Sequence, residues 1–281
     1  MSDTSKKYKL TDMAMEWRGH TLYRIRAVVD FGKIRAGELG GWIEGERNLS
    51  HDGLCWVSDN AKVYSRAFVG GDATVAGEAS VYDSAEVVDS VIIHDEAEVY
   101  GLASVDSDAR ILGCARVYGG AQVSGDAVVR DHAQVFDNAL VYERAQIYGR
   151  AQVFDQACIS GDANIFDEAK VFNCANVYGN ALVFDQAYVY GGAKVFGDAK
   201  IYGHASVSDN AVVFDEAKVY GDSRVLYDSR VYYNEEIKDS IVAMRWPRGT
   251  ECTAKVVETV CKAVLQRFDA ESGKPLDDTE K

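Results

Sequence analysis

Five histidines are the side chains of this chain best suited to acid–base chemistry: His20, His51, His94, His132 and His204. A neutral imidazole within reach of a hydroxyl or amine can act as its general base. We take His94 and His132 as the candidate catalytic bases. The chain contains no GxSxG motif and no glycine-rich phosphate-binding loop, so no nucleophile or phosphate site accompanies them. The residues by themselves therefore define no catalytic centre.

The cysteines do not form a metal-binding or redox pattern. There is no CxxC pair and no spacing typical of a zinc site among Cys55, Cys114, Cys158, Cys174, Cys252 and Cys261. We expect reduced thiols, no metal and no cofactor.

The charge of the chain limits its partners. A net charge of −14 disfavours direct binding to nucleic acid, which requires clustered Lys and Arg. The N-terminus has no apolar signal core, and no run of about 18 apolar residues occurs, so we predict a cytoplasmic protein without a membrane contact. The negative charge is compatible with a basic partner, or with a surface that takes the place of a nucleic acid on its binding protein.

A six-residue repeat determines where these side chains lie. From Ala61 to Asn234 the sequence divides into 29 hexads without an inserted or deleted residue. The first position is Ala in 26 hexads, and the third is Val or Ile in all of them. A type held so strictly at one phase must face a uniform interior. Positions five and six favour Gly, Asp and Asn, which tolerate tight corners.

Each hexad thus reads as a short strand and a turn, and three hexads close one triangular coil. The 29 hexads give nine to ten coils, and stacking at about 4.8 Å predicts a rod roughly 45 Å long. The predicted fold is an all-β, triangular parallel β-solenoid.

Residues 18 apart lie above one another in such a rod, so outward positions become rows. The fourth hexad position on one face forms a row of eight aromatic residues: Tyr64, Tyr82, Tyr100, Tyr118, Phe136, Phe154, Phe172 and Tyr190. The rings could stabilise the rod by stacking, or form an exposed apolar stripe that binds a partner. The sixth position at one corner forms an acidic ridge: Asp72, Asp108, Asp126, Asp162, Asp198 and Glu216.

The repeat resembles the hexapeptide repeat of left-handed parallel β-helix proteins. The segment GGWIEGERNLSHDGLCWVSDNAKVY (residues 40–64) is similar to the start of YdcK-like hexapeptide-repeat proteins of enterobacteria and phages, which are classed as transferases. The resemblance implies left-handed coiling. For activity it implies acyl transfer by a histidine between subunits, with a loop that covers the donor. The unbroken register from residue 61 to residue 234 leaves no room for that loop.

The ends of the chain depart from the repeat. We predict an N-terminal cap with a small β-hairpin over residues 1–50, the solenoid over 51–244, and a capping helix with a polar tail over 245–281. The helix is indicated by apolar residues at helical spacing between Thr250 and Phe268.

The favoured function is a noncatalytic scaffold or protein-binding rod, a dimer or trimer formed through the aromatic face. The first alternative is an acyltransferase-like enzyme with a site between subunits. The second, suggested by the acidic ridge, is a decoy or inhibitor of a host nucleic-acid-binding protein, encoded by a bacterium or a phage.

Overall fold

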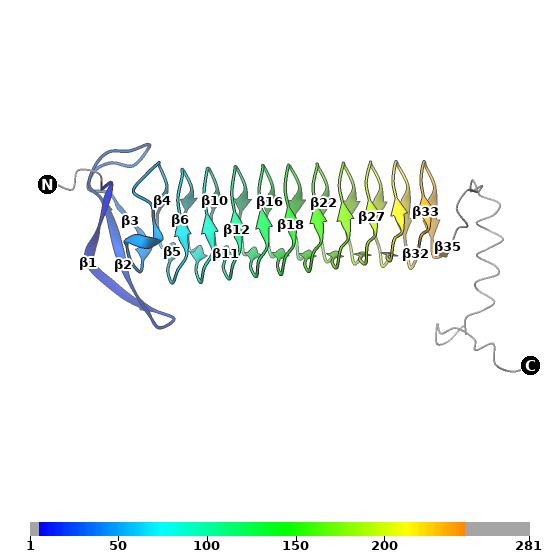
Figure 1. Cartoon of the computed structure of the whole chain (residues 1–281), viewed down its shortest axis with the longest axis horizontal. Coiled ribbons are helices and arrows are strands. Elements are labelled where there is room, and N and C mark those ends of the chain that lie inside the picture. Colours follow the sequence, from blue (N-terminus) through cyan, green and yellow to red (C-terminus); the bar gives the residue numbers. More distant parts are fainter. Residues whose placement is uncertain (1–5, 245–281) are drawn as a thin grey trace, which may run out of the picture.

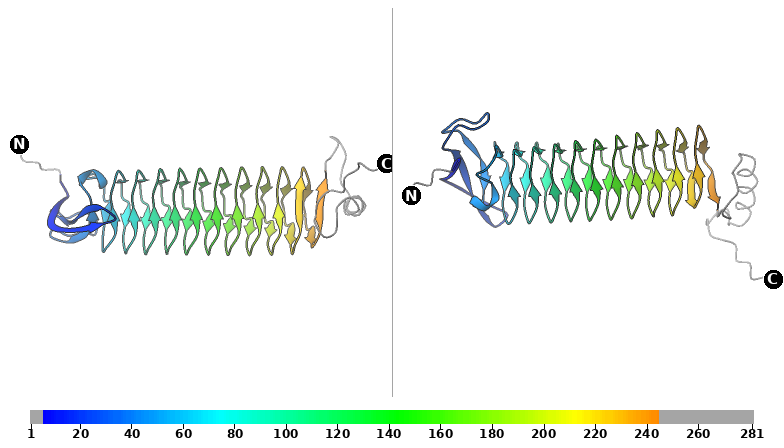
Figure 2. Two further views of the ribbon diagram at one scale, coloured as in Figure 1. Left: turned by 90° about the horizontal axis from the view of Figure 1, so that it is seen from below. Right: turned by 45° about the horizontal axis from the view of Figure 1, so that its top comes forward.

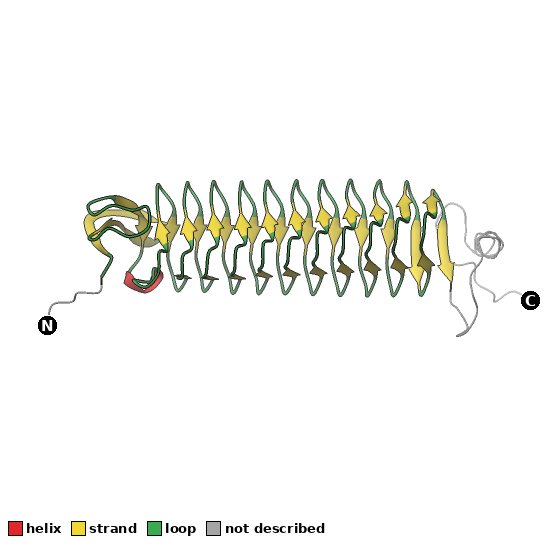
Figure 3. Ribbon diagram, turned by 90° about the horizontal axis from the view of Figure 1, so that it is seen from above, coloured by secondary structure: helices red, strands yellow, loops and turns green. Residues whose placement is uncertain are grey.

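The computed structural model describes residues 6–244 and shows one straight parallel β-solenoid with a β-hairpin at its N-terminal end (Figure 1). Three sheets run along the rod, one on each side of a triangular coil (Figure 2). The solenoid strands within each sheet are parallel, and only the N-terminal hairpin adds antiparallel strands. The predicted all-β solenoid is therefore confirmed. The one helical element among the described residues is the short 3-10 helix η1 (Glu46–Asn48), drawn in red in Figure 3.

The long sheet contains β1 (Tyr8–Trp17), β2 (His20–Ala27), β3 (Leu39–Ile43), β5 (Lys62–Val63), β8 (Ser80–Val81), β11 (Glu98–Val99), β14 (Arg116–Val117), β17 (Gln134–Val135), β20 (Gln152–Val153), β23 (Lys170–Val171), β26 (Tyr188–Val189), β29 (Ser206–Val207), β32 (Arg224–Tyr227) and β35 (Ile241–Met244). The second sheet contains β4 (Trp56–Val57), β7 (Thr74–Val75), β10 (Ile92–Ile93), β13 (Arg110–Ile111), β16 (Val128–Val129), β19 (Gln146–Ile147), β22 (Asn164–Ile165), β25 (Leu182–Val183), β28 (Lys200–Ile201), β31 (Lys218–Tyr220) and β34 (Glu236–Lys238). The third sheet contains β6 (Phe68–Val69), β9 (Glu86–Val87), β12 (Ser104–Val105), β15 (Gln122–Val123), β18 (Leu140–Val141), β21 (Cys158–Ile159), β24 (Asn176–Val177), β27 (Lys194–Val195), β30 (Val212–Val213) and β33 (Arg230–Val231).

The number of coils exceeds the prediction. The second sheet has 11 strands, one for each coil, so the rod makes about 11 coils rather than nine to ten. The extra coils come from residues outside the regular hexads, at β3 and β4 before the repeat and at β34 and β35 after it. The predicted C-terminal capping helix lies outside the described residues.

The hexad pattern places the core as predicted. The alanines of position one and the Val or Ile of position three are buried throughout the repeat. Backbone N–H groups join each coil to the next: the Lys62 N–H donates to the Ala79 carbonyl at 2.9 Å, and the Tyr64 N–H donates to the Val81 carbonyl at 3.1 Å. Every described strand except those at the ends is thus paired on both edges.

The corner residues at position five have a role beyond tolerating a positive φ. Asp83, with φ 59°, accepts a hydrogen bond from the Gly101 N–H of the next coil at 3.3 Å. The same bond, to the residue 18 positions ahead, is made by a set of corner carboxylates: Asp59, Asp83, Asp89, Asp95, Asp131, Glu143, Asp155, Asp167, Asp185, Asp209 and Asp215. These side chains satisfy N–H groups that the strand ladders leave unpaired.

The corner bond of Asp95 makes stability depend on pH. The Gly113 N–H, 2.9 Å from Asp95 Oδ2, and then the His94 ring lower the pKa of Asp95. Because the folded pKa lies below the ordinary value of 3.8, this stabilisation is present above that value and is lost as the pH falls through the folded pKa. We expect Asp95→Asn to melt slightly below the parent at pH 6, by at most about 0.5 kcal/mol because the site is exposed. Thermal melts at pH 6 and pH 2 check this, and a difference that persists at pH 2 would contradict it.

The N-terminal hairpin continues the long sheet. Strands β1 and β2 pair antiparallel through a two-residue turn at Arg18 and Gly19, which both have positive φ, and β3 then pairs in parallel with β5. The predicted β cap is therefore present, and its first strand rather than a solenoid strand forms the outer edge of this sheet (Figure 1).

Candidate interaction surface

The eight aromatic residues of position four form a continuous stack on the long sheet, which we call the long aromatic file. Adjacent ring centroids from Tyr64 to Tyr190 lie 4.8–5.2 Å apart with interplanar angles of 0–6°. The strand spacing sets this distance, since each ring belongs to the residue that directly follows a strand of the long sheet, one coil after the ring before it. Neighbouring rings therefore cover one another's faces, and the file presents ring edges to solvent.

This stacking makes the file less exposed than the sequence suggested. The rings from Tyr82 to Tyr190 are half-buried rather than fully exposed. Tyr64 is only 2% exposed, because His20 of the hairpin lies against its ring with centroids 5.0 Å apart. Burial, followed by repulsion from Glu98, raises the pKa of Tyr82 to about 12. The rings thus form an uncharged ridge at neutral pH, and its accessible part begins beyond the hairpin.

Two shorter files occupy the other faces in the C-terminal coils. The second file consists of Tyr148, Phe166, Phe184, Tyr202 and Tyr220, and the third of Tyr178, Phe196, Phe214 and Tyr232. Cations close both ends of the second file. The Arg130 guanidinium lies 4.1 Å from the centroid of Tyr148, and Lys238 Nζ lies 6.0 Å from that of Tyr220. In the sequence, each cation lies one coil away from the ring that it contacts. That spacing could have predicted both cation–ring contacts.

The hairpin tip forms a crevice of about 370 Å³ against the long sheet. Arg18 and Arg116 both contact Glu98 at 3.2 Å, and Arg18 also lies over the Tyr82 ring at 5.5 Å. Lys62 is buried, with its Nζ 4.5 Å from the Trp17 ring centroid and 3.3 Å from Glu78. These charges pair with one another, so the crevice holds the hairpin on the rod.

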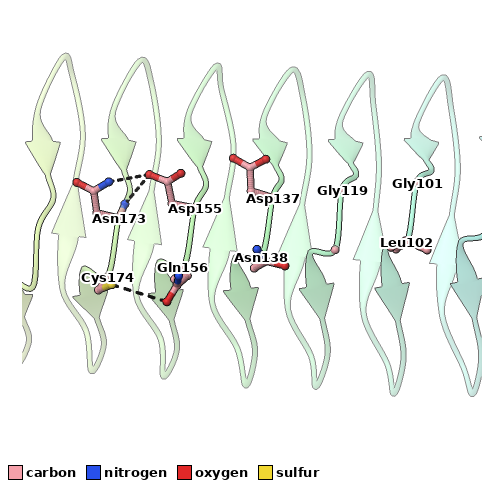
Figure 4. A pocket seen from close by; sticks show the side chains of 10 residues that line it. Gly101, Leu102, Gly119, Asp137, Asn138, Asp155, Gln156, Asn173 and Cys174 are labelled. Carbon is pink, nitrogen blue, oxygen red and sulfur yellow. Dashed lines mark hydrogen bonds between the residues drawn. The ribbon is translucent and has the colours of Figure 1, made fainter.

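A larger groove of about 770 Å³ follows one corner across several coils (Figure 4). It exists because Gly101, Gly119 and Gly120 supply no side chains there. Its polar lining is internally bonded: Asp155 accepts from both nitrogens of Asn173, and Cys174 Sγ lies 3.8 Å from Gln156 Oε1. No histidine is among the described residues that line this groove.

The histidines are not brought together. His94 follows β10 of the second sheet, with Nδ1 2.8 Å from the neighbouring Asp95, whereas His132 and His204 stand exposed at a corner. His20 contacts Glu44 at 3.4 Å, and the His51 ring stacks on Tyr8 at 4.2 Å. Within residues 6–244 there is no group of three His, Cys, Asp or Glu side chains that could hold a metal ion.

The acidic ridge is present as a corner row but is interrupted. Arg144 pairs with Asp162 at 2.6 Å, and the Asn180 amide donates to Asp198 at 2.9 Å. At the start of the row, Asp72 accepts the Leu54 N–H at 2.9 Å. One of the acidic side chains, Asp162, is thus paired with a cation of the same row, and the row is not an even line of charge. Across the described part of the chain, no helix has the length and apolar character needed to span a membrane.

Comparison with known proteins gives one short similarity. No family model matches the chain. Over 52 residues the chain is 40% identical to a protein of Escherichia coli (strain K12) named uncharacterized acetyltransferase YdcK. The matched stretch makes up 18% of this chain and 16% of the E. coli protein. Together with the three-stranded coils of the rod, this similarity agrees with the hexapeptide-repeat β-helix resemblance found in the sequence.

Proposed function

We propose that this protein is a noncatalytic rod that binds protein, and that it assembles with further copies of itself through the long aromatic file. The observation that carries the proposal is the unbroken register from residue 61 to residue 234, in which each coil bonds directly to the next. Catalytic side chains are usually carried on loops. A rod of this regularity has rows of side chains instead, and rows suit recognition of another surface.

The geometry of the rings favours a protein partner over a sugar or a base. Sugars and bases stack on aromatic faces, and here the inner faces are already occupied by neighbouring rings. The exposed edges form an apolar ridge from Tyr100 to Tyr190, about 24 Å long over five coil steps. A second copy offers an identical ridge, so a two-fold axis can bring the two together in a self-complementary contact.

Light scattering at several protein concentrations tests this assembly. We expect the parent to have the mass of a dimer or trimer, and a variant with Tyr100, Tyr118 and Phe136 changed to Ser to have the mass of a monomer. The matched control changes Phe166, Phe184 and Tyr202 of the second file to Ser. It loses as many stacked rings, so it should be destabilised to a similar extent, by about 0.5–1 kcal/mol for each lost ring pair, yet keep the parent's mass.

Circular dichroism must show that both triple variants are folded. A monomeric parent, or dissociation of the control as well, would mean that the long file is not the interface.

The second candidate function is an acyltransferase with a site between subunits, and the similarity to the E. coli protein named as an acetyltransferase favours it. A thiol-release assay with acetyl coenzyme A and a panel of amine and hydroxyl acceptors tests this candidate. The noncatalytic proposal expects no release above background. Release that is abolished in His94→Ala or His132→Ala would replace that proposal with the enzyme.

A further inference from the structure

A lysine and a cysteine from distant parts of the N-terminal cap meet inside the protein. Lys7 directly precedes β1, and Cys55 directly precedes β4. Lys7 Nζ lies 3.2 Å from Cys55 Sγ. Lys7 is 4% exposed and Cys55 is fully buried, so the pair is screened from solvent.

Among the described residues, the amine has hydrogen-bond acceptors but no salt-bridge partner. Its other hydrogen bonds go to the carbonyl oxygens of Asp52 at 3.2 Å and Gly53 at 3.1 Å, and the Phe31 ring centroid lies 5.2 Å away. A buried lysine normally pairs with a carboxylate. Here the sulfur takes that place, which holds the nitrogen and the sulfur in direct contact.

The other cysteines of the described chain have different neighbours. Cys114 lies 3.6 Å from Glu96, Cys158 lies 3.6 Å from the Tyr142 hydroxyl, and Cys174 contacts Gln156. None of these contacts involves an amine. Burial raises the pKa of Cys55 in spite of the adjacent ammonium, so the group is a thiol at neutral pH.

We propose that Lys7 and Cys55 are a modification site at which dioxygen joins the two side chains through a nitrogen–oxygen–sulfur bridge. Once the ammonium has released a proton to solvent, the amine and the thiol together lose two hydrogens, and the bridge gains one oxygen atom and keeps one N–H. The second oxygen atom leaves with those hydrogens as water. Nitrogen and sulfur each give up two electrons, and these four electrons reduce the dioxygen. Dioxygen is small and uncharged, which suits a buried pair.

The bridge ties the hairpin to the solenoid. It connects the residue before β1 with the residue before β4, 48 positions later, and so closes a loop that contains β1, β2 and β3. A cross-link of this kind restricts the unfolded chain and raises the melting temperature. Under oxidising conditions the cap that protects the edge of the long sheet then gains a second covalent link to the rod, besides the backbone.

Mass spectrometry of the full-length protein after exposure to air tests the proposal. We expect a gain of about 14 Da, and a cross-linked peptide pair that contains Lys7 and Cys55 and separates after treatment with dithiothreitol. Lys7→Arg and Cys55→Ser should each abolish the product, whereas Cys158→Ser should retain it. The melting temperature of the parent should fall by several degrees on reduction, and that of Cys55→Ser should not.

Other masses would overturn the inference. An unchanged mass after prolonged exposure to air would show that the contact is only a hydrogen bond. A gain of about 16 Da without a cross-link would indicate a sulfenic acid, and a loss of about 2 Da would indicate a direct nitrogen–sulfur bond. These measurements need no variant to fold, because the parent protein supplies the decisive result.

Discussion

A Val123→Asp protein is expected to lose the native solenoid under conditions in which a Gln122→Asp protein stays folded. Both residues lie on β15, but Val123 is fully buried and Gln122 is exposed. The new carboxylate at position 123 would stand among stacked valines without a hydrogen-bond partner. We expect a loss of about 4–5 kcal/mol or more, which is at the upper end for a single substitution. Thermal melts followed by circular dichroism measure the difference.

Gln122→Asp controls for the added charge and for the lower strand propensity of Asp, because it places the same residue one position away on the opposite side of the strand. Its melting temperature should lie within a few degrees of the parent. If the two variants melted alike, the inward and outward phases of the hexad would be wrong.

Deletion of one whole coil is expected to be tolerated, whereas deletion of half a hexad is not. Removal of residues 109–126 takes out one strand from each sheet and joins Asp108 to Ala127 in the same register. Each remaining coil then meets a neighbour of the same pattern, and Tyr100 can stack on Phe136. Stability in a repeat protein depends on such nearest-neighbour contacts. We expect a folded rod that melts within a few degrees of the parent.

Removal of only residues 109–111 shortens one coil by half a hexad, so that coil cannot span the perimeter of the complete coils on either side. The two halves of the rod then lose their shared ladder. We expect the melting temperature to fall by about 10 °C or more, or the single transition to split in two. A short deletion that melts like the parent would show that the coils are not coupled through this perimeter.

The repeat itself could be predicted because its physics is local and periodic. Val or Ile at the third position of every hexad, and Ala at the first position of most, define the core without knowledge of any distant contact. The rows of side chains follow from the same arithmetic, and the stacking of Tyr100 on Tyr118 at 4.8 Å agrees with it. The solvent exposure of the aromatic rings could not be predicted from this arithmetic, because each ring is covered by the neighbouring rings as well as by the sheet beneath.

The cap could be predicted only in outline. Alternation around Leu22–Val29 indicates a hairpin, but no periodic signal tells where its tip will lie. The contacts of Arg18 with Glu98 and of His20 with Tyr64 join residues that no repeat relates. The same is true of Lys7 and Cys55. The sequence did not predict that corner carboxylates such as Asp83 accept a hydrogen bond from the next coil. The tolerance of Asp for a positive φ already accounted for the residue type at these corners. The repetition of the carboxylates at intervals of one coil could have indicated the hydrogen bond as well.

The three-hexad coil underlies every row described above, and engineered disulfides test it most directly. Cys174 Sγ lies 3.8 Å from Gln156 Oε1, one coil away, whereas Asn138 lies a further coil along the same corner (Figure 4). One coil step of about 4.8 Å suits a disulfide, and two steps of about 10 Å exceed its reach. Non-reducing peptide mapping after mild oxidation should find a bond to Cys174 in Gln156→Cys and none in Asn138→Cys. A bond in the second protein, or its absence in the first, would contradict the three-hexad coil.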